Sequence, residues 1–301
     1  MEKEKLQIRK IENTESYFTV NWFFIFRCNY DCYYCESHDL ISKIPEVDMI
    51  RGTHYLYELI KKPLMIGFVG GEPFLYKKLV DVFRVNLPIS FRVETNLSAP
   101  LKVLERVPTN CDIKATYHPE FADIDEFVKK ANYIKSVNSN NQCNIAFPVE
   151  EKLWNKALEV YNRVPGSRPI VLQVPSLDWK GSFTKTYDYS DAQKEWLREN
   201  TKDIESNLII TTDKGEKLKK NHRFLAINNL LNFKGWKCYA GNNNIHIDPK
   251  GDVFPASCFL RTRARLGNVF KENIKLLQHG IKCPFDHCGC FSDTRILKEK
   301  I

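Results

Sequence analysis

The sequence predicts an α/β fold: a partial (β/α)6 barrel of the TIM type, followed by a small C-terminal extension built from a β-hairpin and a helix. Residues 17–174 alternate short apolar runs with amphipathic stretches, a pattern typical of βα units around a parallel barrel. The length of 301 residues suits one barrel domain and an appendage. Five of the ten cysteines lie after residue 237, which indicates a separate function for that end.

Six apolar segments are the candidate strands, and the amphipathic segments between them are the candidate helices. We expect strands at 21–26, 64–69, 90–95, 111–117, 143–148 and 169–174. We expect helices near 48–61, 74–84, 100–106, 122–136 and 150–163, with further helices at 189–201 and 216–232. The predicted domains are a barrel core over 1–187, a last helix and connecting segment over 188–235, and a C-terminal domain over 236–301.

The composition is that of a soluble globular protein, with 43% hydrophobic and 27% charged residues. The first twenty residues lack an apolar signal core, and no apolar run is long enough to cross a bilayer. We therefore expect a cytoplasmic protein with no membrane partner. Ten cysteines in a reducing compartment indicate metal ligation rather than disulfides.

The formal net charge of +8 makes the protein mildly basic. Such a charge can attract phosphorylated or nucleic-acid partners. We interpret Lys217, Lys219, Lys220 and Arg223 instead as the solvated face of a helix, and we do not expect a nucleic-acid partner.

Cys28, Cys32 and Cys35 form a C-x-x-x-C-x-x-C pattern directly after the apolar run 22–26. Three thiolates on a short loop can hold one iron–sulfur cube and leave its fourth iron open to a small molecule. The alternative is a structural zinc knuckle. A second pattern, Gly70-Gly71-Glu72-Pro73, follows the run 64–69 and taken alone would be an ordinary glycine turn.

Together these two patterns resemble the signature of the radical S-adenosylmethionine (SAM) enzyme superfamily, in which an aromatic residue, here Tyr34, precedes the third cysteine. The resemblance implies a [4Fe-4S] cluster with an open iron that chelates SAM. It also implies that Gly70, Gly71, Glu72 and Pro73 surround the SAM amino group, with Glu72 nearest to it.

The family also touches SAM with a Thr-Asn-Gly-like segment at the end of the third strand. Here Thr95 and Asn96 match that segment, but Leu97 replaces the glycine. The resemblance therefore carries SAM contacts over to Asn96 and Ser98.

Further polar residues lie near the predicted strand ends, where barrel enzymes build their active sites: Lys114, His118, Asn144 and Gln173. Any one of them could simply satisfy local backbone groups. Together they could line a polar pocket, with His118 as the best acid/base candidate. Cys111 and Cys143 lie inside apolar runs, and we expect them to be small core residues.

The five C-terminal cysteines are Cys238, Cys258, Cys283, Cys288 and Cys290. We expect a hairpin over 245–255 to bring Cys238 and Cys258 together. We expect a helix near 271–279 to lead the chain back, so that Cys283, Cys288 and Cys290 lie near them. The segment resembles the Twitch or truncated SPASM extensions of radical SAM enzymes. This resemblance implies a second [4Fe-4S] cluster held by four of the five, with His246 and His287 outside the ligand set.

Two alternatives stay open at this end of the chain. Four thiolates also suit a zinc ion. The unused cysteine is either a buried bystander or a thiol that returns a hydrogen atom to a substrate radical, as a resemblance to radical epimerases suggests.

The resemblance implies that one electron, from a low-potential donor such as flavodoxin or ferredoxin, cleaves SAM to a 5′-deoxyadenosyl radical. This radical then removes hydrogen from a substrate C–H bond. The first hypothesis for the substrate is a ribosomally made peptide. The alternative is radical dehydrogenation or epimerisation of a sugar, aminocyclitol or nucleotide. A hypothesis of another class is a non-catalytic Fe-S or Zn binding protein.

Overall fold

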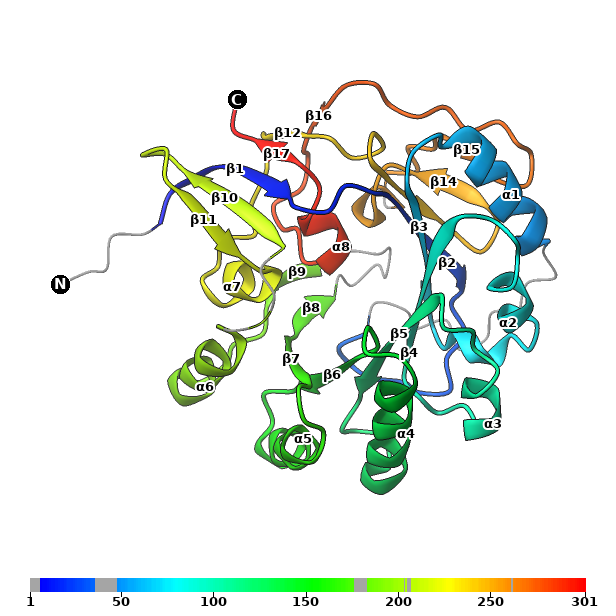
Figure 1. Ribbon diagram of the computed structural model, residues 1–301. Helices are drawn as coiled ribbons and strands as arrows, with labels where there is room; N and C mark the ends of the chain where they lie inside the picture. Colours follow the sequence, from blue (N-terminus) through cyan, green and yellow to red (C-terminus); the bar gives the residue numbers. More distant parts are fainter. Residues whose placement is uncertain (1–5, 36–47, 176–182, 203, 205–206, 261) are drawn as a thin grey trace.

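A computed structural model describes residues 6–35, 48–175, 183–202, 204, 207–260 and 262–301. Its larger sheet has nine strands, and six consecutive ones are parallel neighbours in chain order. This arrangement confirms the predicted partial barrel (Figure 1). The six strands are β2 (Phe18–Ile25), β3 (Leu64–Gly70), β4 (Ile89–Thr95), β5 (Cys111–Tyr117), β6 (Gln142–Phe147) and β7 (Arg168–Val171).

Helices follow the strands and lie outside them (Figure 1). The helix expected at 122–136 is confirmed, and it buries Phe127, Val128, Ala131 and Ile134 on one face. The helices expected at 74–84 and 100–106 are shorter than predicted. The first segment contains the 3-10 turn η1 (Pro73–Leu75), which ends in extended backbone, followed by a four-residue helix, and the second contains another four-residue helix. The helices are α1 (Met49–Leu59), α2 (Leu79–Val82), α3 (Leu101–Leu104), α4 (Ile124–Val137), α5 (Glu151–Arg163) and α6 (Asp191–Thr201).

The expected C-terminal hairpin is present as β13 (Asn244–Ile247) and β14 (Asp252–Phe254). It continues the barrel sheet, because β13 pairs in parallel with β2 and β14 pairs with β15 (Gly267–Asn268). The helix expected near 271–279 is wrong. Glu272 has a φ of 54°, and this left-handed conformation interrupts a right-handed helix.

A second sheet joins the two ends of the chain in the order β11-β10-β1-β17-β12-β16 (upper left in Figure 1). The helix expected at 216–232 is wrong over its first part. Gly215, with a φ of 87°, turns the chain so that Lys217–Lys220 pairs with β10, and Asn221 then caps α7 (His222–Ile227). The strands are β1 (Ile8–Asn13), β10 (Leu208–Thr212), β11 (Lys217–Lys220), β12 (Lys237–Cys238), β16 (Ile281–Lys282) and β17 (Lys298–Glu299).

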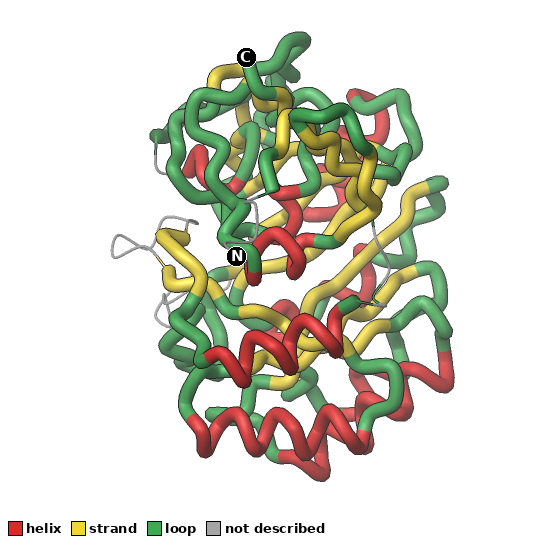
Figure 2. The backbone as a smooth tube through the Cα atoms, turned by 90° about the vertical axis from the view of Figure 1, so that its left-hand side faces the viewer, coloured by secondary structure: helices red, strands yellow, loops and turns green. Residues whose placement is uncertain are grey.

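The segment 236–301 therefore contributes strands to both sheets and is interleaved with the rest of the molecule. Figure 2 shows its loops and short strands at the top, with long helices along the lower edge. The remaining elements are β8 (Gln173–Pro175), β9 (Phe183–Thr186), η2 (Ser257–Leu260) and α8 (Phe291–Thr294). None of the helices in the described ranges has both the length and the apolar character needed to cross a membrane.

Candidate active site

A cavity of about 860 Å³ runs through the barrel. Successive side chains of a strand face opposite sides, so alternate residues of β4 to β7 point inward. The sequence predicted a polar pocket from Lys114, His118, Asn144 and Gln173, and all four line this cavity. Cys111 and Cys143 are buried, as expected, among core residues.

Cys28, Cys32 and Cys35 all line one end of the cavity. The loop that carries them is a tight turn, in which the amide of Cys35 donates to the carbonyl oxygen of Cys32 at 2.9 Å. The Tyr30 amide donates to Cys28 Sγ at 3.4 Å. Burial raises the pKa of the Cys28 thiol and raises that of Cys32 to about 12, so a bound cation is needed to hold them as thiolates.

Within the described ranges, His246, Cys290 and Asp293 form the one group that brings three possible metal-ligand atoms within 4.8 Å of one another. The donor chemistry of the two cysteine sets suits an iron–sulfur cluster, and it also suits zinc.

The glycine motif is attached directly to the cysteine loop. The amide of Gly71 donates to the carbonyl oxygen of Ile25 at 2.8 Å, and the amide of Glu72 donates to that of Arg27 at 2.9 Å. A Cβ atom on Gly71 would overlap the carbonyl group of Arg27. Gly70 has a φ of 135°, which only glycine adopts without strain. The two motifs are therefore one structural unit.

Glu72 lies behind the cavity wall and is 1% exposed. Its Oε1 accepts hydrogen bonds from Thr95 Oγ1 at 2.8 Å and from the Phe74 amide at 3.0 Å, and its Oε2 accepts from the Asn96 amide at 2.8 Å. Burial raises its pKa to about 7. Gly70 and Gly71 line the cavity, whereas Glu72 fixes the end of β4 from behind.

The turn after β4 places Asn96 and Ser98 beside the cysteine loop. Asn96 Nδ2 donates to Asn29 Oδ1 at 3.0 Å, and Ser98 Oγ donates to the same oxygen at 3.2 Å. Leu97 has a φ of 56°, so it adopts the left-handed conformation that suits a glycine. Its side chain is 2% exposed, and this burial offsets the backbone strain.

His118 packs against the cysteine loop. Its Nδ1 lies 3.1 Å from the Tyr34 hydroxyl and 3.6 Å from Cys32 Sγ, and its ring stacks on that of Tyr34 at 5.9 Å. Burial lowers the pKa of His118 to about 4, so the imidazole is neutral at pH 7. Through these contacts, His118 packs against and supports the loop that carries Cys32.

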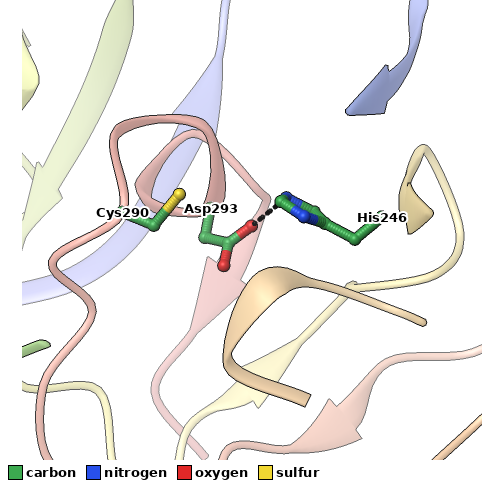
Figure 3. A group of neighbouring side chains, drawn as sticks. All are labelled: His246, Cys290 and Asp293. Carbon is green, nitrogen blue, oxygen red and sulfur yellow. Dashed lines mark ion pairs between the residues drawn. The ribbon is translucent and has the colours of Figure 1, made fainter. Parts of the chain in front are cut away.

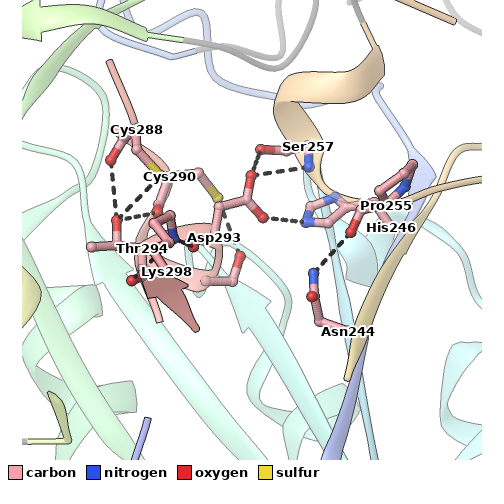
Figure 4. Close-up of polar contacts among 10 residues, drawn as sticks. Asn244, His246, Pro255, Ser257, Cys288, Cys290, Asp293, Thr294 and Lys298 are labelled. Carbon is pink, nitrogen blue, oxygen red and sulfur yellow. Dashed lines mark hydrogen bonds and ion pairs between the residues drawn. The ribbon is translucent and has the colours of Figure 1, made fainter. Parts of the chain in front are cut away.

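The structure separates the five C-terminal cysteines into four and one. Cys238, Cys258, Cys283 and Cys288 lie close enough to interact electrostatically with one another. Lys298, 1% exposed, lies among them, and its ammonium donates to the carbonyl oxygen of Asp293 at 2.6 Å (Figure 4). Cys290 differs from the other four because it lines the barrel cavity.

Asp293 and His246 form a buried pair behind Cys290 (Figure 3). His246 Nε2 lies 3.4 Å from Asp293 Oδ1, and the other carboxylate oxygen accepts from the Ser257 amide at 3.0 Å. Burial is the largest single influence on the pKa of the Asp293 carboxyl and raises it. The nearby imidazole opposes burial, and the resulting pKa is lower than usual. His246 is fully buried, and together with Cys290 and Asp293 it forms a group of possible metal ligands, although we expected it to lie outside the ligand set. His287 Nε2 donates to Gln173 Oε1 at 2.9 Å.

The interpretation of Arg223 as part of a solvated helix face is wrong. Arg223 is buried and lines the cavity, and its Nε donates to the carbonyl oxygen of Pro169. Sequence reasoning also missed other cavity residues, among them Arg92, Arg168, Phe291 and Arg295. Arg92 could have been identified from the alternation of apolar and polar residues along β4, in which Arg92 and Glu94 each stand between buried neighbours.

No family model matches this sequence, and no curated protein matches it. Solved structures do match the fold. Streptococcus suis SuiB bound to precursor peptide SuiA is 17% identical, with a TM-score of 0.54 over 87% of this chain, which spans 64% of SuiB. Native anSMEcpe with bound AdoMet and Cp18Cys peptide is 17% identical, with a TM-score of 0.55. The match covers 84% of this chain and 79% of the anSMEcpe chain. Both are radical SAM enzymes, and this chain has their fold.

The contact between the glycine motif and the cysteine loop gives the first prediction. Gly71→Ala should displace the loop, because the new methyl group overlaps the Arg27 carbonyl, and anaerobically reconstituted protein should lose about half of its iron. Gly67→Ala on β3, the strand that precedes Gly71, is the matched control, since its Cβ meets nothing closer than Asn21 Oδ1 at 3.6 Å. Equal iron contents in the two variants would contradict the coupling.

Proposed function

We propose that this chain is a radical SAM enzyme, which cleaves SAM reductively and abstracts hydrogen from a substrate C–H bond. One observation carries the proposal. Cys28, Cys32 and Cys35 line the same cavity as Gly70 and Gly71, and the two motifs follow the neighbouring parallel strands β2 and β3.

The residues fit the group that the fold implies. Cys28, Cys32 and Cys35 would hold a [4Fe-4S] cluster with one iron open, because the donors are all sulfur and the three cysteines face the cavity. When bound, this cluster supplies the electron that cleaves the sulfonium bond of SAM to give the 5′-deoxyadenosyl radical. Tyr34, Asn96 and Ser98 would enclose the SAM molecule next to it.

Glu72 has a different part in this proposal from the direct SAM contact that the family resemblance implies. Its two carboxylate oxygens already accept three hydrogen bonds. It therefore acts as a positioning residue that holds Asn96 against the cysteine loop. Pro73 begins the turn η1 that completes this support.

A second [4Fe-4S] cluster would be held by Cys238, Cys258, Cys283 and Cys288. These four thiols converge in the interior, and burial raises the pKa of each. The ammonium of Lys298 among them favours the thiolate forms that iron requires. A low-potential donor such as flavodoxin or ferredoxin would supply electrons, and we place the enzyme in the cytoplasm because such clusters are oxygen-sensitive.

The first candidate substrate is a ribosomally made peptide. Two structures that share the fold contain peptides: SuiB with precursor peptide SuiA, and anSMEcpe with the Cp18Cys peptide. The enzyme would hold the target residue in the barrel cavity and exclude water from the radical.

The second candidate is epimerisation of a sugar, aminocyclitol or nucleotide, and the position of Cys290 favours it. Cys290 lines the cavity, whereas the other four C-terminal cysteines do not. Its S–H bond would break as a new C–H bond forms on the opposite face of the substrate radical. One electron from the low-potential donor and one proton would then restore the thiol.

The cysteine loop provides the main test. Replacing Cys28, Cys32 and Cys35 by alanine should remove about half of the roughly eight irons expected for two cubes, and all release of 5′-deoxyadenosine. The measurement is iron analysis and chromatography of reactions with SAM and a strong reductant. Release of 5′-deoxyadenosine by the triple variant at the wild-type rate would refute the proposed site.

The division of the C-terminal cysteines is tested by iron content alone. Cys288→Ala should lose about four irons, whereas Cys290→Ala should keep about eight, because only the former is expected to be a ligand. Each variant serves as the control for the other. Loss of iron from Cys290→Ala instead would place Cys290 in the ligand set.

Isotope incorporation separates epimerisation from dehydrogenation. Holoenzyme, SAM, reductant and a metabolite extract are incubated in D2O, and the products are analysed by mass spectrometry. Epimerisation should add one deuterium from the exchanged Cys290 thiol, and the Cys290→Ala variant should not incorporate it. A product that has lost two hydrogens and carries no deuterium would exclude epimerisation and favour dehydrogenation.

A further inference from the structure

His246, Cys290 and Asp293 bring three different kinds of metal-binding side chain into one compact group (Figure 3). One ligand atom from each residue lies within 4.8 Å of the other two. Cys290 immediately precedes α8 and Asp293 lies three residues later, so one helical turn brings them close together. His246 reaches them from β13, the strand that extends the barrel sheet beside β2.

The polar atoms at the centre of this group are not satisfied by hydrogen bonds. His246 is 0% exposed and Asp293 is 2% exposed. In the part of the chain that the structure describes, both ring nitrogens of His246 and Oδ1 of Asp293 are buried without a hydrogen-bond partner. Nε2 and Oδ1 face each other at 3.4 Å, which is longer than the usual N–H···O distance of about 2.7–3.2 Å. Buried polar atoms without partners are rare, so this arrangement indicates a site for a cation.

The separations of the donor atoms suit a tetrahedral zinc ion. Zinc binds nitrogen and oxygen at about 2.0 Å and sulfur at about 2.3 Å, so its ligand atoms lie about 3.3–3.6 Å apart. The distance of 3.4 Å between His246 Nε2 and Asp293 Oδ1 already matches this separation. Cys290 Sγ is within 4.8 Å of both atoms, so it needs to approach them by roughly 1 Å to complete the site.

The donor types and their charges select the ion. Calcium and magnesium prefer oxygen ligands, whereas a thiolate, an imidazole and a carboxylate together suit zinc. The thiolate and the carboxylate carry two negative charges, and a neutral imidazole adds none. A divalent ion therefore makes the group electrically neutral, which lowers the cost of burying it.

Neighbouring residues hold two of the ligands in their orientations. The second carboxylate oxygen of Asp293, Oδ2, accepts hydrogen bonds from the amide of Ser257 at 3.0 Å and from its hydroxyl. These bonds leave Oδ1 directed at His246. The His246 ring stacks on the ring of Phe23, with the centroids 4.9 Å apart. Such supporting contacts around the ligands are typical of metal sites.

We propose that His246, Cys290 and Asp293 bind one zinc ion, separate from the two cysteine sets. Of the three residues, only Cys290 lines the barrel cavity, so the ion lies at the cavity wall. The inference does not depend on the radical SAM function proposed above, but it bears on the second candidate substrate. Zinc binding displaces the thiol proton of Cys290 to solvent. A zinc-bound thiolate has no S–H bond, so Cys290 would then not return a hydrogen atom to a substrate radical.

The test combines metal analysis with zinc X-ray absorption on anaerobically reconstituted protein that has been supplied with zinc and desalted. The wild type should retain about one zinc, with one sulfur neighbour at about 2.3 Å and nitrogen or oxygen neighbours at about 2.0 Å. Cys290→Ala and Asp293→Asn should each bind zinc more weakly by about tenfold or more in competition with a chelator, because each loses a ligand. Cys111→Ala, which removes a buried thiol from β5, is the matched control and should bind zinc as the wild type does.

Each outcome bears on the proposal. A wild type that retains no zinc, or equal zinc affinities in Cys290→Ala and Cys111→Ala, would overturn it. Zinc with three or four sulfur neighbours would place the ion in a cysteine set and would overturn it as well. Iron content checks that each variant is folded. Release of 5′-deoxyadenosine by the wild type is measured separately, so failure of the zinc site and failure of the radical SAM function are distinguishable.

Discussion

The candidate active site depends on a backbone contact between the ends of two neighbouring strands. The amides of Gly71 and Glu72 donate to carbonyl oxygens at the end of β2, just before the cysteine loop begins. Only glycine allows this approach, because a Cβ atom at position 71 would overlap the facing carbonyl. The buried carboxylate of Glu72 then fixes Asn96 relative to this contact, because it accepts a hydrogen bond from the Asn96 amide. The loop, the glycine motif and the end of β4 are thus fixed relative to one another before any cofactor binds.

The C-terminal segment places Cys290 at the surface of the cavity. The other four C-terminal cysteines do not line the cavity. Strand β13 continues the barrel sheet beside β2, while β12 and β17 pair in the sheet that contains β1. The chain therefore crosses to the barrel sheet between β12 and β13 and returns to the second sheet between β15 and β16. Thr294 on α8 donates to the carbonyl oxygens of both Cys288 and Cys290, which holds the connecting loop. A small helix thus lies next to the cavity-facing thiol of Cys290 and the interior thiol of Cys288.

The sequence predicted the features that depend on local pattern. The strand expected at 64–69 is β3, because these residues form a short continuous apolar run. The helix expected at 122–136 is α4, because its apolar residues recur at spacings of three and four. Features that depend on distant partners were not predictable. Strand β1 pairs with β10 and β17, and Lys217–Lys220 becomes a strand because β10 accepts it. Arg223 was assigned to the surface for the same reason, since no local pattern shows that α7 faces the cavity.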